Sequence, residues 1–189
     1  MKRFCIIAIL GLISIGLFAQ EHLAFKGVPI DGKLSDFVSR LEQNGFTFVQ
    51  NDAEGAYMRG VFTGKECTLY IEASPISKTV HTVFVLFNPL EDWATLKNDY
   101  ATIKKGLILK YGEPKAYKEE VRSPYKEGDG HAYMAFKGGY ADWHSSFSAP
   151  QGAIDLYIRQ QDWNELNVIV KYADKVNTKK STNELTADL

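Results

Sequence analysis

Cys67, the one cysteine beyond the N-terminal segment, is the first candidate for a reactive residue. It stands in the run KECTLYIEA, where Cys67, Leu69 and Ile71 alternate with polar or aromatic residues. This alternation places the three on one face of a β-strand. Free cysteine commonly behaves as a small buried apolar residue, and no neighbouring histidine is present to activate a nucleophile. We predict a core cysteine, with a disulfide to another chain as the alternative.

A second candidate site combines two histidines and a carboxylate. His131, Asp142 and His144 would share one face of a hairpin if Gly138 and Gly139 form its turn. Imidazole and carboxylate groups so placed suit a weak transition-metal or acid–base site. The spacing is generic, however, and the chain lacks an HExxH or paired-cysteine motif. We expect a solvated strand face and no cofactor or metal, and keep a metal or acid–base site as the alternative.

The familiar motifs of enzyme families are not found in the chain. It has no GxSxG, no phosphate-binding glycine loop and no dinucleotide fingerprint. Acidic residues are scattered, and a pair of catalytic carboxylates is defined by its separation in space, which sequence spacing does not reveal. The chain is therefore expected to be non-catalytic, while a hydrolase stays open as an alternative.

Tyrosine and arginine side chains offer a more distributed signal. If the apolar residues of each predicted strand point inward, the other face collects tyrosines interleaved with charged residues. Tyr and Arg are enriched at protein interfaces because they combine a large contact area with a polar tip. The predicted partner-binding residues are Tyr57, Arg59, Tyr70, Tyr133, His144, Tyr157, Arg159 and Trp163. A plain structural surface is the alternative, since Tyr also favours half-exposed strands.

Two helices are expected to support that surface. In residues 31–46, apolar Leu34, Phe37, Val38 and Leu41 follow helical spacing, and Gly45 is suited to end the helix. Residues 91–114 carry a longer apolar stripe, which begins after Asp92 and stops at Gly112 and Pro114. Gly106 inside this second helix is expected to permit close packing against a sheet.

Strands fill most of the remaining sequence. They are predicted at 56–63, 66–73 and 79–87 after the first helix, and at 115–121, 131–137, 140–147, 153–160 and 165–172 after the second. The strand at 79–87 is apolar on both faces, which indicates a central or covered position. Runs of strands after each helix predict an α+β fold made of two tandem helix-then-antiparallel-strand units. These units would form one curved sheet with two helices packed on one face.

This layout is similar to the tandem helix-plus-sheet fold of the β-lactamase inhibitor protein family and of small envelope-assembly lipoproteins. The pattern F-x-G-x-P-I-D-G followed by L-x-x-F-x-x-x-L-x-x-x-G-F, from Phe25 to Phe46, also resembles exported proteins of unknown function from gut Gram-negative bacteria. The resemblance covers most of the chain in layout and only short stretches in residues. It transfers no functional residue to this sequence, and a shared fold does not specify a function.

The N-terminus predicts export. Lys2 and Arg3 precede an apolar run that ends before Ala19, which is the plan of a secretory signal peptide over residues 1–20. We expect cleavage near Ala19 or Gln20, with an uncleaved anchor as the alternative. A single domain over 21–176 and a flexible polar tail over 177–189 would follow.

These features together predict a periplasmic or secreted module that binds an unknown envelope protein or peptide. The formal net charge of −1 gives no sign of a nucleic-acid partner, and no other stretch of the chain is apolar enough to span a membrane. A periplasmic hydrolase or a glycan-binding domain that uses the same sheet face is the alternative, because aromatic platforms also stack on sugar rings.

Overall fold

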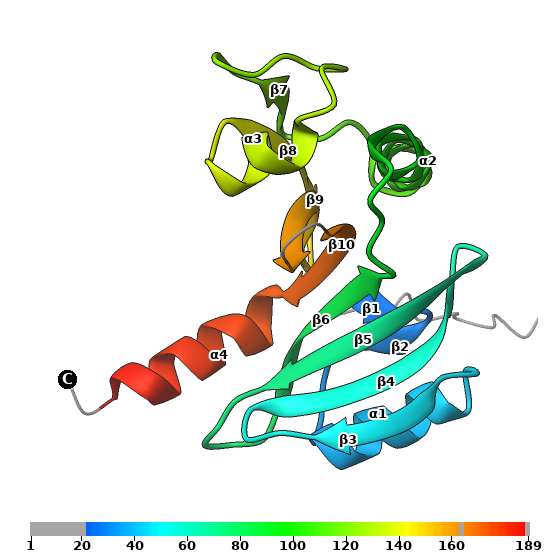
Figure 1. Ribbon diagram of the computed structural model, residues 1–189. Helices are drawn as coiled ribbons and strands as arrows, with labels where there is room; N and C mark the ends of the chain where they lie inside the picture. The colour runs from blue at the N-terminus through cyan, green and yellow to red at the C-terminus, as the bar shows by residue number, and fades with distance from the viewer. Residues whose placement is uncertain (1–21, 163–164, 188–189) are drawn as a thin grey trace, which may run out of the picture.

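The structure, a computed structural model, describes residues 22–162 and 165–187 (Figure 1). Its helices are α1 (Leu34–Glu42), α2 (Trp93–Tyr111), α3 (Ala132–Lys137) and α4 (Lys175–Thr186). Its strands are β1 (Ala24–Phe25), β2 (Val28–Pro29), β3 (Thr47–Asn51), β4 (Gly55–Phe62), β5 (Lys65–Ala73), β6 (Val80–Phe87), β7 (Ala116–Val121), β8 (Ala141–Ala149), β9 (Gly152–Asp162) and β10 (Glu165–Asp174). Strands β1 and β2 form a small hairpin, and the others form one antiparallel sheet.

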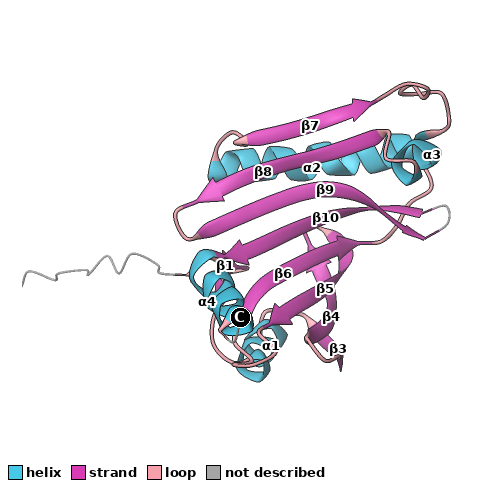
Figure 2. Ribbon diagram, turned by 90° about the vertical axis from the view of Figure 1, so that its left-hand side faces the viewer, coloured by secondary structure: helices cyan, strands magenta, loops and turns pink. Residues whose placement is uncertain are grey.

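The sheet order confirms the predicted tandem α+β layout. Across the sheet the order is β3-β4-β5-β6-β10-β9-β8-β7, so each half is a meander that follows one helix, α1 or α2. The last strands of the two meanders, β6 and β10, pair at the centre. This explains why β6 is apolar on both faces, as its sequence indicated. In Figure 2 the strands fan across the view, and α2 runs behind β7 and β8.

Helix α1 forms where the apolar spacing predicts it. Phe37, Val38 and Leu41 are buried on its inner side. The chain then turns at Gly45, whose φ of 87° lies in the left-handed region that glycine adopts without strain. This turn directs the chain into β3, which pairs with β4 and adds a strand that the sequence did not reveal.

Helix α2 is anchored at both ends and in the middle. At its start Asp92 accepts a hydrogen bond from the Thr95 amide at 2.7 Å, and Gly112 ends it with a φ of 80°. Halfway along, the buried Tyr100 hydroxyl and the Ser145 hydroxyl of β8 lie 2.8 Å apart. These contacts fix the helix across the second meander.

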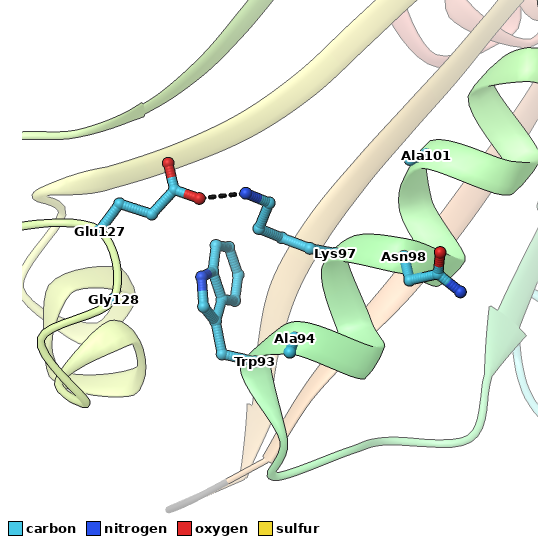
Figure 3. A pocket seen from close by; sticks show the side chains of 7 residues that line it. All are labelled: Trp93, Ala94, Lys97, Asn98, Ala101, Glu127 and Gly128. Atoms are coloured by element: carbon cyan, nitrogen blue, oxygen red, sulfur yellow. Dashed lines mark hydrogen bonds and ion pairs between the residues drawn. The ribbon is translucent and has the colours of Figure 1, made fainter.

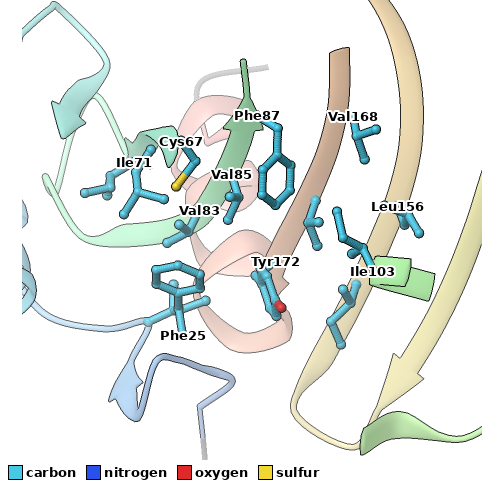
Figure 4. Packing of buried hydrophobic residues seen from close by; sticks show 14 of the residues in the cluster. Phe25, Cys67, Ile71, Val83, Val85, Phe87, Ile103, Leu156, Val168 and Tyr172 are labelled. Carbon is cyan, nitrogen blue, oxygen red and sulfur yellow. The ribbon is translucent and has the colours of Figure 1, made fainter. Parts of the chain in front are cut away.

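The core lies between the sheet and these helices. Cys67 is buried in it, only 4% exposed, as predicted. Burial raises the pKa of the Cys67 thiol to about 11, so the thiol is protonated at neutral pH and is a poor nucleophile. Figure 4 shows Cys67, Val83 and Val85 packed beside Phe25 of β1, with Tyr172 of β10 next to them.

Helix α4 occupies a segment for which the prediction was wrong. Residues 177–189 were expected to be a flexible polar tail, but Lys175–Thr186 are helical. Polar contacts hold this helix in place, and it therefore needs no apolar stripe. Asp174 caps it through the Asn177 amide at 2.8 Å, the Asn177 side chain donates to the Ile30 carbonyl at 3.0 Å, and Ser74 donates to Glu184. Sequence periodicity does not report contacts of this kind.

The strand predicted at 131–137 is also wrong. Ala132–Lys137 form the short helix α3, and Gly138 and Gly139 end that helix instead of forming a hairpin turn. Ala135 is buried, and Phe136 packs near Trp93 with ring centroids 5.7 Å apart. The segment alternates too weakly to dictate a strand, and Ala, Met and Lys favour a helix wherever packing allows one.

The predicted signal peptide and its cleavage site lie outside the described residues, and export therefore stays a prediction. Within residues 22–162 and 165–187, none of the helices combines the length and the apolar character that a bilayer span requires.

Candidate protein-binding face

Strand register brings four side chains into one row across the sheet. Tyr57 of β4 is paired with Tyr70 of β5, Tyr70 with Phe84 of β6, and Phe84 with Lys171 of β10. Residues directly opposite each other in antiparallel strands point to the same face and touch. The ring centroids lie 4.8 Å apart for Tyr57 and Tyr70 and 6.1 Å apart for Tyr70 and Phe84, and the Lys171 Nζ lies 5.6 Å from the Phe84 centroid.

This row lies on the sheet face opposite α1 and α2. The residues next to it in each strand, Met58, Leu69 and Val85, are buried in the core, so the alternating residues point the other way. We call this side the open face, and we call Tyr57, Tyr70 and Phe84 its aromatic half. All three of these side chains are half-buried. Helix α4 borders one end of the open face, where Thr178 and Ser181 lie near Glu72 and His81.

Burial and nearby carboxylates both raise the pKa of the tyrosines in the aromatic half. Burial, with the charges of Asp52 and Glu72 next in importance, raises the pKa of Tyr70 to about 12. Burial, the charge of Asp52 and a hydrogen bond to Asp52 also raise the pKa of Tyr57. Both phenols are therefore protonated at physiological pH; the Tyr57 hydroxyl donates to Asp52, and the Tyr70 hydroxyl can donate to a partner. Burial likewise raises the pKa of Glu72, while Lys171 acts in the opposite direction.

The other end of the open face has a different character. There Ser146 donates to Asp155 Oδ1 at 2.5 Å, and His144 Nε2 lies 2.8 Å from the Ser146 hydroxyl. We call His144, Ser146 and Asp155 the polar half. Further towards the sheet edge, Lys118 lies 3.3 Å from Glu120 and 3.5 Å from Asp142. The polar side chains of this half bond to one another.

The polar half contains the residue types of a serine hydrolase in a different order. In a catalytic triad the serine proton passes to histidine, and the carboxylate orients the histidine from its other nitrogen. Here the serine lies in the middle, and its hydroxyl donates a hydrogen bond to Asp155. The cluster therefore differs from a triad in that the carboxylate contacts the serine and not the histidine, and it links β8 to β9 through hydrogen bonds.

The predicted binding residues fall into three groups. Tyr57, Arg59, Tyr70, His144, Tyr157 and Arg159 lie on the open face, as their strand pairings show. Tyr133 does not lie there, because its segment is helix α3 and its hydroxyl accepts a hydrogen bond from Gln160 Nε2 at 3.0 Å. Trp163 lies outside the described residues.

Phe84 and Lys171 complete the aromatic row and were not among the predicted residues. Their strands, β6 and β10, are far apart in the sequence, and alternation within one strand does not reveal its pairing partner. In addition, the register of β5 and β6 shifts between Glu72 and Ala73. A bulge of this kind decides which side chains oppose each other and leaves no clear sequence signal.

The prediction of a hairpin that brings His131, Asp142 and His144 together is wrong. His131 precedes α3, and its amide donates to Asp129 at 2.8 Å, while His144 of β8 is paired with Tyr157 and Lys118. Asp142 lies near Lys118 instead. Among the residues that the structure describes, no group of three or more His, Cys, Asp or Glu side chains is arranged to hold a metal ion.

A separate hollow of about 690 Å³ lies beside the first turns of α2 (Figure 3). The loop that contains Glu127 and Gly128 forms its other wall. Its charged groups, Lys97 and Glu127, form an ion pair with each other, and Trp93 packs edge-on against Trp143 with centroids 4.8 Å apart. The hollow is thus wide and shallow, and its two charges neutralise each other.

Comparison of the chain with protein-family models, with characterised proteins and with solved structures found no match.

Proposed function

We propose that this protein is an exported, non-catalytic module of the cell envelope that binds a protein or peptide through its open face. Export, in the periplasm or beyond, follows from the N-terminal pattern of the sequence. The observation that carries the binding proposal is the aromatic half. There Tyr57, Tyr70 and Phe84 lie side by side across three strands, half-exposed and on the face opposite α1 and α2.

The side chains of the aromatic half leave ring surface available to a partner. Aromatic residues contribute large and rigid contact areas, and little side-chain entropy is lost when they bind. Tyr70 adds a protonated hydroxyl that can donate a hydrogen bond, while the Tyr57 hydroxyl is bonded to Asp52. Arg59 is exposed on the same strand as Tyr57 and adds a charged side chain beside the row. Such a composition is typical of the central part of a protein interface.

Glycan binding is the second candidate, because sugar rings also stack on aromatic side chains. The geometry of the row favours a protein partner. The planes of Tyr70 and Phe84 differ by 29°, and those of Tyr57 and Tyr70 by 32°. Rings that lean on one another in this way use part of their flat faces within the row. They then present edges and hydroxyls, which suit hydrogen bonds and side-chain packing more than a sugar laid flat.

Cross-linking in the source cells tests the proposal. The tagged protein is cross-linked in intact cells, and the captured species are identified by mass spectrometry. We expect one dominant protein that is lost from the double variant Tyr57→Ala/Tyr70→Ala. The matched variant His144→Ala/Ser146→Ala changes the polar half of the same face and should retain it. Capture that is equal in both variants would overturn the assignment, provided that thermal unfolding shows both to be folded.

A further inference from the structure

A cavity on the opposite side of the sheet from the open face has the features of a small-molecule site. The cavity, of about 230 Å³, opens between α2, the β1–β2 turn and the β4–β5 turn. It is lined by Ala24, Lys26, Phe62, Thr63, Thr102, Ile103, Gly106, Leu107, Lys110 and Tyr172. The cavity therefore sits where the first meander, the second helix and the N-terminal hairpin meet. Small-molecule sites are concave and mostly apolar, as this cavity is.

Gly106 gives the first argument for a ligand. Glycine inside a helix costs up to about 1 kcal/mol relative to alanine. The expected reason for this residue, close packing against the sheet, is wrong, because a Cβ atom built at Gly106 would meet no heavy atom within 4 Å. Gly106 instead lines the cavity. A larger residue at this position would fill space that the fold leaves open.

The floor of the cavity is apolar. Phe62, Ile103, Leu107 and Tyr172 all belong to the core or pack against it. Phe62 and Tyr172 meet edge to face, with ring centroids 6.4 Å apart. In Figure 4 Tyr172 lies between Phe25 of β1 and Ile103 of α2. The Tyr172 hydroxyl makes no hydrogen bond to any residue within the described ranges, so it is available as a donor to a ligand.

The rim of the cavity is cationic. Lys26 lies in the β1–β2 turn and Lys110 in the last turn of α2, and both are exposed. Neither forms an ion pair with a carboxylate of the described chain, and the Lys110 Nζ lies 5.1 Å from the centroid of the Tyr111 ring. An apolar floor beneath two such ammonium groups complements a ligand that has an apolar body and one negative charge.

We propose that this cavity binds a small amphipathic anion, such as a medium-length acyl chain that carries a carboxylate. The chain lies over Phe62, Leu107 and Tyr172 beside Gly106, and the carboxylate lies between the Lys26 and Lys110 ammonium groups. The cavity is smaller than the roughly 300–1,000 Å³ of pockets that hold drug-sized ligands, which favours a slender ligand. This site is independent of the open face, and either proposal can fail without the other.

The test is an amide NMR titration of the purified protein with decanoate, decanol and decyltrimethylammonium. These probes share the chain length and differ in head-group charge. We expect decanoate to shift the amide signals of residues 24–26, 62–63 and 102–110. Decanol should bind at least about tenfold more weakly and the cation more weakly still, since two nearby lysines favour a negative charge.

Three variants separate the cavity from non-specific binding. Gly106→Met fills the cavity and should weaken decanoate binding at least about tenfold, since an acyl chain would lose its buried contacts. Leu109→Met is the matched control, because Leu109 lies on the same helix and is 82% exposed. It should bind decanoate like the unmodified protein. The double variant Lys26→Gln/Lys110→Gln should bind decanoate and decanol about equally.

Unchanged decanoate binding by folded Gly106→Met would overturn the proposal. So would equal affinity of the unmodified protein for all three probes, or amide shifts confined to the open face.

Discussion

The two halves of the open face differ in the contacts that their side chains make. In the aromatic half, Tyr57, Tyr70 and Phe84 contact one another through ring surfaces and are half-exposed, and of the two hydroxyls only that of Tyr57 is bonded, to Asp52. In the polar half, each group bonds within the sheet, as Ser146 does with Asp155 and His144. The two halves occupy corresponding places in the two meanders of one sheet.

This difference indicates that binding and stability depend on different halves of the face. Side chains that are bonded to one another lose those bonds when a partner competes for them, and the net gain is small. Aromatic surface that is only half-buried gains free energy when a partner covers it. We infer that the aromatic half carries binding and that the polar half ties β8 to β9.

The largest expected effect is on partner affinity. Tyr57→Ala/Tyr70→Ala should weaken binding of the identified partner at least about thirtyfold, because truncation of central aromatic residues at interfaces costs about 2 kcal/mol or more. His144→Ala/Ser146→Ala should change affinity less than about threefold. Calorimetric titration of the purified pair measures both. Equal losses in the two variants would remove the distinction between the halves.

Substitutions in the polar half should instead lower the stability of the fold. Asp155→Ala removes the acceptor of the Ser146 hydroxyl and should lower the free energy of unfolding by about 1–2 kcal/mol. Tyr70→Phe removes only a half-exposed hydroxyl and should stay within about 0.5 kcal/mol of the unmodified protein. Chemical denaturation at neutral pH gives both values. A larger loss in Tyr70→Phe than in Asp155→Ala would reverse the roles assigned to the two halves.

Alkaline pH should reveal the environment of Tyr70. Its pKa in the folded protein is raised to about 12, above the value near 10 of an unfolded chain. The stability that the neutral phenol contributes is thus fully present below about pH 10 and falls as pH rises towards 12. Unfolding free energies measured over this range should decline less steeply for Tyr70→Phe. Identical slopes would mean that the carboxylates and burial around Tyr70 do not act as described.

The smallest effect concerns Glu72, at the border of the aromatic half. Its pKa is raised by burial, so its contribution to stability is present at acidic pH and is lost as pH rises through that pKa. Glu72→Gln should therefore stabilise the fold at neutral pH by less than about 0.5 kcal/mol, and the gain should disappear in acid. Thermal unfolding at the two pH values measures the difference. Destabilisation at neutral pH would show that the attraction to Lys171 outweighs burial.

The fold was predictable from the sequence to the extent that apolar periodicity determined it. The stripes of α1 and α2 and the alternation in β5 were sufficient to predict two helices over one side of an antiparallel sheet. Helix α4 was missed because Asp174 and Asn177 hold it through polar contacts instead of an apolar stripe. Helix α3 was misread because two glycines can end a helix as well as form a hairpin.

The candidate site was predictable only strand by strand. Alternation assigned Tyr57, Tyr70 and Tyr157 to the open face, because each neighbours buried apolar residues. It could not join Phe84 and Lys171 to the row, since that requires the pairing of β6 with β10 and the register shift next to Glu72. Tyr133 was assigned to the face through a strand that does not exist. Long-range pairing is set by the packing of the whole chain.

Site-specific photo-cross-linking tests the central claim most directly. A photo-reactive amino acid is placed at Thr68, beside Tyr70 on the open face, or at Ser148, beside the polar half, and the cells are irradiated. Both positions lie on the same sheet face, and neither side chain belongs to the core. The account predicts one dominant protein adduct from position 68, abolished by Tyr57→Ala/Tyr70→Ala, and little adduct from position 148. Equal adducts from both positions, or an adduct that survives loss of the two tyrosines, would contradict it.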